Sequence, residues 1–268
     1  MYELIISPHL DDALFSLSKY LISFKGNIII ATLFTKEVNN NFTGDYALYA
    51  DTKKRKKEDH DAINEIYSYN NEINITVIHL NLPDELFRDS NTNKFINDNI
   101  CKKFSELSYK YNIGNVLCPI GVGEHNDHLL TYNNSIKFFK KDKIFFYYDY
   151  PYCNLKINLI KRLNSIGIYN NYKLTLNDIY EYYYHPIYQS CPVILRILRI
   201  FVSLISYYFS YFFTKKINIL LFTNSIDFKV KYNIISKYDS QIKPIFGNDN
   251  NLINNLKKYQ DEFYLKIE

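Results

Sequence analysis

The 268-residue chain has no tryptophan, one methionine and only seven glycines, seven prolines and four cysteines. The cysteines lie far apart and form no C-x-x-C pair; they are Cys101, Cys118, Cys153 and Cys191. This spacing argues against a zinc ribbon, a thioredoxin-like site and a dense disulfide framework, and it favours reduced thiols in a cytosolic protein. The net charge is only +4, so we expect no nucleic-acid partner.

Two further signals are missing near the start of the chain. Residues 1–6 show no basic stretch followed by a cleavable apolar segment, so we expect no secretion signal and a cytoplasmic location. No G-x-G-x-x-G motif or P-loop follows the first strand-like run. A dinucleotide or nucleoside triphosphate ligand is therefore not expected.

Apolar strand-like runs alternate with helix-like patterns over the first 150 residues. The strand patterns cover residues 2–7, 27–34, 74–80, 113–118 and 143–148. The helix patterns cover residues 12–24, 52–69, 93–111 and 128–140. This alternation predicts an α/β fold, with a Rossmann-like, mostly parallel sheet, helices on both faces and a C-terminal extension. The length fits a single domain over residues 1–268.

The region after residue 151 gives weaker signals. We expect a strand over 225–230, a helix from about 231 to 240 and an amphipathic segment over 252–263. Residues 193–213 are strongly apolar, but the uncharged part, 200–213, is shorter than the roughly 20 residues that a bilayer span needs. A core or interface helix, a membrane-surface helix and, least favoured, a true span are the three interpretations.

Two polar clusters follow strand-like runs, where open α/β sheets bind their ligands. The first is S-P-H-L-D-D at residues 7–12, and the second ends in H-N-D-H at residues 125–128. His9 and Asp12 are three residues apart and can point to the same side of a strand-to-helix turn. With His128 they make a two-histidine, one-carboxylate set with an open position, which suits catalytic zinc, although iron or another divalent ion is an alternative.

The remaining polar residues of the clusters have candidate roles in hydrolysis. Asp11 could accept the proton of a metal-activated water, and His125 could stabilise an oxyanion or protonate a leaving amine. Asp127 could hold an imidazole in the required tautomer. Taken alone, either cluster also fits a plain structural role, because aspartate at a helix start is often only an N-cap.

The paired motifs P-H-L-D-D and H-N-D-H resemble the signature of the PIG-L/LmbE-like N-acetylglucosaminyl de-N-acetylases, in the bacterial branch with H-L-D-D. Residues 55–58 resemble that family's R-x-x-E helix, residues 147–152 its Y-E-D-x-P-Y run, and residues 231–241 its K…Y-x-S-Q element. The similarity covers nearly the whole chain in the right order. Leu10 and Ala13 stand where many members have proline and glutamate, which the bacterial branch tolerates.

The resemblance implies a Rossmann-like zinc hydrolase that removes acetyl from an N-acetylated amino-sugar conjugate. It places the metal ligands on three residues: His9, Asp12 and His128. It places the general base on Asp11 and the oxyanion-stabilising histidine on His125. Arg55 matches a residue that in some members faces the sugar conjugate, and an exposed charge at a basic helix start is the alternative. Asp149 is expected to line the pocket, with an ordinary strand end as the alternative. Loops 36–50 and 83–91 are expected to border the same site.

Two other functions compete with this interpretation. One is a non-catalytic sugar- or metal-binding protein on the same fold, although such a protein would have no use for Asp11. The other is a membrane-associated scaffold that uses residues 193–213. The apolar segment also predicts peripheral contact with a membrane, whereas the sequence predicts no oligomeric state.

Overall fold

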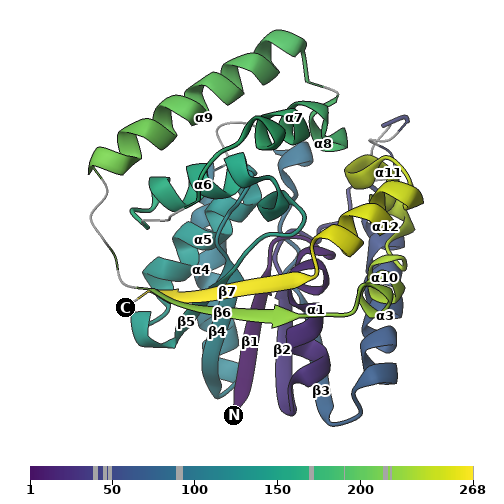
Figure 1. Ribbon diagram of the computed structural model, residues 1–268. Coiled ribbons are helices and arrows are strands. Elements are labelled where there is room, and N and C mark those ends of the chain that lie inside the picture. The colour runs from purple at the N-terminus through teal and green to yellow at the C-terminus, as the bar shows by residue number, and fades with distance from the viewer. Residues whose placement is uncertain are drawn as a thin grey trace.

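The computed structural model describes residues 1–38, 42–44, 47, 50–88, 93–168, 172–189, 191–213, 217 and 219–267. Its centre is a seven-stranded sheet in the order β3-β2-β1-β4-β5-β7-β6 (Figure 1). The strands are β1 Tyr2–Ser7, β2 Gly26–Thr32, β3 Ile73–His79, β4 Ile113–Pro119, β5 Ile144–Tyr147, β6 Ile219–Ser225 and β7 Asp261–Ile267. Strands β1 to β5 are parallel, and β7 runs antiparallel to both of its neighbours. The mostly parallel α/β fold predicted from the sequence is confirmed.

Helices cover both faces of the sheet, because successive strand residues point to opposite sides. On β1, Leu4 and Ile6 pack against α4 Asn93–Lys110, α5 Asn126–Phe138 and α6 Lys156–Ser165. Ile5 points to the other face, which is covered by α1 Asp12–Ser23, α3 Thr52–Tyr69, α10 Phe228–Ile235, α11 Asp239–Phe246 and α12 Asp249–Lys258. A layer made of α7 Leu176–Tyr184, α8 Pro186–Gln189 and α9 Val193–Phe213 lies outside α6 (Figure 1).

The C-terminal predictions need correction. The predicted strand over 225–230 is wrong, because β6 ends at Ser225 and Asp227 caps α10 by accepting a hydrogen bond from the backbone N–H of Lys229 (2.8 Å). The predicted helix 231–240 is two helices, α10 and α11, separated by a turn. The amphipathic segment 252–263 divides into the end of α12 and the start of β7.

Residues 193–213 form one helix, but the helix is not a core element. Two of its polar side chains face the protein: Arg196 is 8% exposed and Ser203 is 5% exposed. Its large apolar side chains face outward, among them Ile194, Phe201 and Tyr208. Within the described part of the chain, no helix combines the length and the apolar character that spanning a bilayer requires. The contact of α9 with a membrane surface stays a prediction.

Candidate active site

The two polar clusters meet where β1 and β4 lie side by side. His9 follows the end of β1 by two residues, and His128 lies in the first turn of α5, after β4. The crossover from β1 leads to β2 on one side, whereas β4 lies on the other, so this edge is a topological switch point of the sheet. Ligands of open α/β sheets bind at such points.

The turn at residues 7–12 is fixed by its own polar atoms. The Ser7 hydroxyl donates to the carbonyl oxygen of His9 (2.5 Å) and accepts from the backbone N–H of Ala13 (3.1 Å). Asp12 Oδ2 accepts from the backbone N–H of His9 (2.8 Å). The serine and the second aspartate therefore hold His9 over the start of α1.

Three potential ligand atoms converge at the switch point. Asp12 Oδ2 lies 3.2 Å from His9 Nδ1 and 3.3 Å from His128 Nε2. One ligand atom from each of these three buried residues lies within 4.8 Å of the others. Two imidazoles and one carboxylate this close together match the ligand set of a catalytic divalent cation.

The other nitrogen of each imidazole is held by a carboxylate. His128 Nδ1 lies 2.6 Å from Asp149 Oδ1, and the second oxygen of Asp149 accepts from the backbone N–H groups of Gly121 and Val122 (2.8 Å each). His9 Nε2 lies 3.1 Å from Asp127 Oδ2. Such carboxylate partners fix the tautomer and orientation of metal-ligating histidines, so the chemistry of the donor set fits a metal.

A second group of His9, His125 and Asp127 also brings potential ligand atoms within 4.8 Å of one another. Asp127 is already engaged, because Arg88 forms an ion pair with Oδ1 and the backbone N–H of Glu85 donates to Oδ2 (3.1 Å). The group containing Asp12 is therefore the better candidate.

The site concentrates negative charge. Burial lowers the pKa of His9, but Asp84, Asp12 and Asp127 together raise it well above the ordinary value. Burial likewise opposes the charged form of His128, whose pKa is nevertheless raised by Asp12 and Asp149. The same negative potential that favours a proton on these rings would favour a divalent cation in its place.

His125 is electrically different from the other two histidines. Burial, followed by the neighbouring His9 and His128, lowers its pKa to about 4, so the ring is neutral at pH 7. Its Nδ1 accepts from the backbone N–H of Asp127 (3.3 Å), which leaves the proton on Nε2. A neutral imidazole in this tautomer is a hydrogen-bond donor.

Asp11 lies beside the donor group but has a different partner. Its Oδ1 accepts from Arg55 Nη2 (2.8 Å), and both side chains are buried. Behind them, the Tyr238 hydroxyl donates to Asp59 Oδ1 (2.7 Å). Burial raises the pKa of Asp59 to about 7, although the bond from Tyr238 and the charge of Arg55 oppose this shift.

A cavity of about 530 Å³ opens over these groups. It is lined by five of the predicted site residues: His9, Asp11, Asp12, Arg55 and His125. His128 and Asp127 lie beneath it. Asp149, for which a substrate contact was expected, is 1% exposed, and its oxygens are bonded to His128 and to backbone N–H groups; its contact with substrate stays a prediction.

The structure adds residues that the motifs did not identify. Asp84 Oδ2 lies 3.3 Å from His9 Nε2, and Arg88 pairs with Asp127. Both belong to the 83–91 loop, which was expected at the rim of the site. The expected position of this loop was therefore the one sequence feature that pointed to these two residues. Arg199 lines the cavity from α9, and nothing in that apolar segment indicated it. The expectation for loop 36–50 falls partly on residues outside those described.

Comparison with known proteins agrees with this geometry. Residues 4–139 match the model of the PIG-L family, described as GlcNAc-PI de-N-acetylase. No curated protein matches the chain. Among solved structures, the zinc-inhibited form of teicoplanin deacetylase has 14% identity and a TM-score of 0.65, covering 100% of this chain and 99% of that one. A40926 pseudoaglycone deacetylase has 15% identity and a TM-score of 0.60, covering 99% and 96%. At these identities, the similarity to the solved structures establishes a shared fold.

Proposed function

The chain belongs to the PIG-L family, and from that premise we propose that it is a metal-dependent hydrolase that removes the N-acetyl group from an N-acetylated amino-sugar conjugate. The observation that carries this proposal is the convergence of His9, Asp12 and His128 at the floor of a cavity, with the additional carboxylate of Asp11 beside them. A non-catalytic binding protein would have no need of that fourth group.

We assign the metal to His9, Asp12 and His128, with zinc as the first choice and Fe²⁺ as the alternative. A bound divalent ion supplies Lewis acidity, which lowers the pKa of a water molecule and polarises an amide carbonyl. Asp149 and Asp127 keep the two imidazoles in the orientation that this binding needs.

Asp11 is the general base in this proposal. Arg55 holds Oδ1, so the carboxylate has a fixed orientation at the cavity wall and its second oxygen is the one we assign to the water proton. Asp11 then returns this proton to the nitrogen as the amide bond breaks, which yields a free amine and acetic acid, and the acid releases its remaining proton to solvent as acetate. His125 is neutral, so we assign it to hydrogen bonding of the oxyanion rather than to proton transfer.

The proposed substrate class rests on the size of the site and on the fold relatives. A cavity of about 530 Å³ lies within the usual range for small-molecule ligands. The solved relatives are named deacetylases of teicoplanin and of A40926 pseudoaglycone, and one of them is a complex with teicoplanin (12% identity, TM-score 0.61, covering 100% of this chain and 99% of that one). These names support an acetylated glycoconjugate.

Two substitutions test the division of roles. Asp11→Asn should keep the metal but lower acetate release by about 10²- to 10⁴-fold, because it removes only the base. His128→Ala should lose the metal and the activity together. The measurements are elemental analysis and acetate release from nucleotide-, thiol- and lipid-linked N-acetylglucosamine.

The matched control is His60→Ala, which removes an exposed histidine on α3 and should change neither quantity. Full metal occupancy in His128→Ala would refute the ligand assignment. A metal-loaded protein that binds these conjugates without releasing acetate would favour the non-catalytic alternative.

A further inference from the structure

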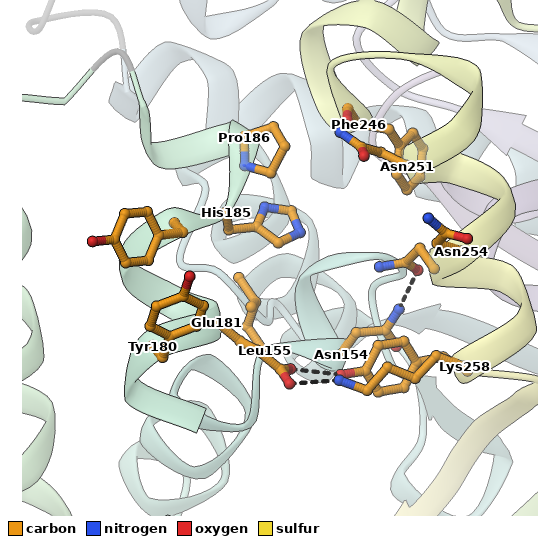
Figure 2. Close-up of a pocket in the computed structure, with 13 residues that line it drawn as sticks. Asn154, Leu155, Tyr180, Glu181, His185, Pro186, Phe246, Asn251, Asn254 and Lys258 are labelled. Carbon is orange, nitrogen blue, oxygen red and sulfur yellow. Dashed lines mark hydrogen bonds and ion pairs between the residues drawn. The ribbon is translucent and has the colours of Figure 1, made fainter. Parts of the chain in front are cut away.

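A second cavity, of about 380 Å³, lies outside the candidate active site (Figure 2). It opens between α7 and α8 on one side and α11 and α12 on the other. The short helices α8 and α11 separate the two cavities: Tyr188 and Ile245 line the active-site cavity, whereas Pro186 and Phe246 line the second one. The volume is sufficient for a small ligand of its own.

One wall of this cavity is aromatic. Tyr180 and Tyr184 lie one turn apart on α7, with ring centroids 4.5 Å apart, and they are 61% and 56% exposed. Phe246 is buried at the opposite side. Rings that are open to solvent at the mouth of a cavity offer flat apolar faces together with hydroxyl groups.

The wall facing the aromatic rings is rich in side-chain amides. The cavity is lined by four asparagines from two segments: Asn154, Asn251, Asn254 and Asn255 (Figure 2). Asn255 Oδ1 accepts from Asn154 Nδ2 (2.9 Å) and from the Tyr150 hydroxyl (2.6 Å), so this amide has a fixed orientation. An amide both donates and accepts, as does the hydroxyl group of a ligand.

The ionisable groups of the cavity carry no unbalanced charge. Glu181 accepts from Lys258 Nζ (2.6 Å) and from the Tyr259 hydroxyl (2.9 Å), which pairs its charge within the wall (Figure 2). Burial lowers the pKa of His185 to about 4, so this imidazole is neutral at pH 7. A neutral ligand therefore suits the cavity better than an ion.

We propose that this cavity binds a neutral sugar ring at a site separate from the one that holds the metal ligands. The apolar face of a pyranose would lie on the tyrosine rings, and its hydroxyls would bond to the asparagine amides. An aliphatic chain would desolvate those amides without replacing their hydrogen bonds. A groove between α7 and α9 offers such a chain an apolar surface instead; Tyr180 and Tyr184 border it as well, but its other lining includes Leu176, Ile179 and Ile197 and no asparagine. This inference does not depend on the proposed hydrolysis.

The absence of tryptophan makes a direct test available. Tyr180→Trp places a single indole at the mouth of the cavity, on a side chain exposed enough to accept the larger ring. Titration with glucose and with N-acetylglucosamine should give a saturable change in its fluorescence. The same indole placed by Tyr109→Trp, at a 96% exposed position on α4, should give none.

Further variants in the Tyr180→Trp protein locate the site. Asn254→Ala should weaken sugar binding at least tenfold, whereas Asn250→Ala, on the same helix but outside the cavity lining, should leave it unchanged. Asp11→Asn should leave the response unchanged, because Asp11 belongs to the other cavity.

Three results would overturn the proposal: no saturable response to either sugar, a response to octanoate alone, or equal sugar affinity in the two asparagine variants. If Tyr180→Trp does not fold, ligand-observed NMR with the unmodified protein and the Asn254→Ala variant makes the same distinction.

Discussion

Charged and apolar side chains are distributed in opposite ways in two regions of the molecule. One is the edge of the sheet that carries the candidate site, called the rim below, and the other is the layer formed by α7 to α9. At the rim, Asp127 and Asp149 are almost fully buried, and each has a cationic or imidazole partner. In α9, Arg196 faces inward while Ile194 and Phe201 face the solvent. Buried ions cost several kcal/mol unless they are paired, so the rim is organised around a site. Exposed apolar groups contribute little to folding, so the outward face of α9 adds little to the stability of the fold.

The largest effect should come from breaking a buried ion pair beside the sheet. Lys231 Nζ lies 2.8 Å from Glu262 Oε1, and both side chains are 1% exposed. Lys231→Met should lower the free energy of unfolding by about 3–5 kcal/mol, because it leaves a buried carboxylate without its cation. Lys25→Met breaks the exposed pair with Glu72 and should cost less than about 1 kcal/mol. If denaturant unfolding showed the same loss of unfolding free energy for Lys231→Met and Lys25→Met, the expected difference between the buried and the exposed ion pair would be wrong.

A smaller effect should follow from loosening one imidazole at the rim. Asp149→Asn weakens the 2.6 Å contact with His128 and should lower metal affinity about 10- to 100-fold, measured by competition with a chelator. The control is Asp178→Asn in α7, whose carboxylate pairs with Lys156 far from the donor group. An unchanged affinity in Asp149→Asn would show that this carboxylate does not position His128.

A pH-dependent effect should arise at Asp59, whose pKa is raised by burial to about 7. Because this value lies above that of the unfolded chain, the stabilising contribution is complete below about pH 4 and is lost as the pH rises towards 7. Asp59→Asn should therefore gain stability relative to the parent protein over this window, by roughly 1 kcal/mol per pH unit. Asp61→Asn, a partly exposed neighbour on the same helix, should show no such trend in unfolding measured from pH 4 to pH 8.

The smallest effect should be on the outer face of α9. Ile194→Ala, at a 71% exposed position, should change the free energy of unfolding by no more than about 0.5 kcal/mol. Ile66→Ala, at a fully buried position of α3, should cost about 2–5 kcal/mol. A large loss at Ile194 would mean that the outer face of α9 is covered. Co-sedimentation of Ile194→Ala with lipid vesicles tests the predicted membrane contact.

The parallel half of the fold was predictable because each of its strands is an apolar run followed by a polar turn. The predicted ranges for β1 to β5 lie within two residues of the observed ones. Strand β6 was missed because it follows the apolar residues of α9 closely, so hydrophobicity does not mark its start. Strand β7 was missed because its sequence, D-E-F-Y-L-K-I, places charged residues in an inner strand, where Glu262 pairs with Lys231 and accepts a hydrogen bond from the backbone N–H of Lys19.

The candidate site was predictable where its residues are close in sequence. His9, Asp11 and Asp12 share one turn, and the spacing of the second cluster added His128. Arg88 and Arg199 reach the site through tertiary contacts that no local pattern records. The end of β5 was located correctly, but the direction of the Asp149 side chain, behind His128, depends on the packing of α5.

The order of strands at the antiparallel edge makes two segments interdependent. Strand β6 precedes β7 in the chain, yet β7 lies between β5 and β6 and provides the hydrogen bonds that attach β6 to the sheet. During folding, β6 can therefore join the sheet only after β7, which follows it in the chain, has paired with β5. A deletion confined to β7 would also detach β6 from the sheet and would leave Lys231 buried without its counterion.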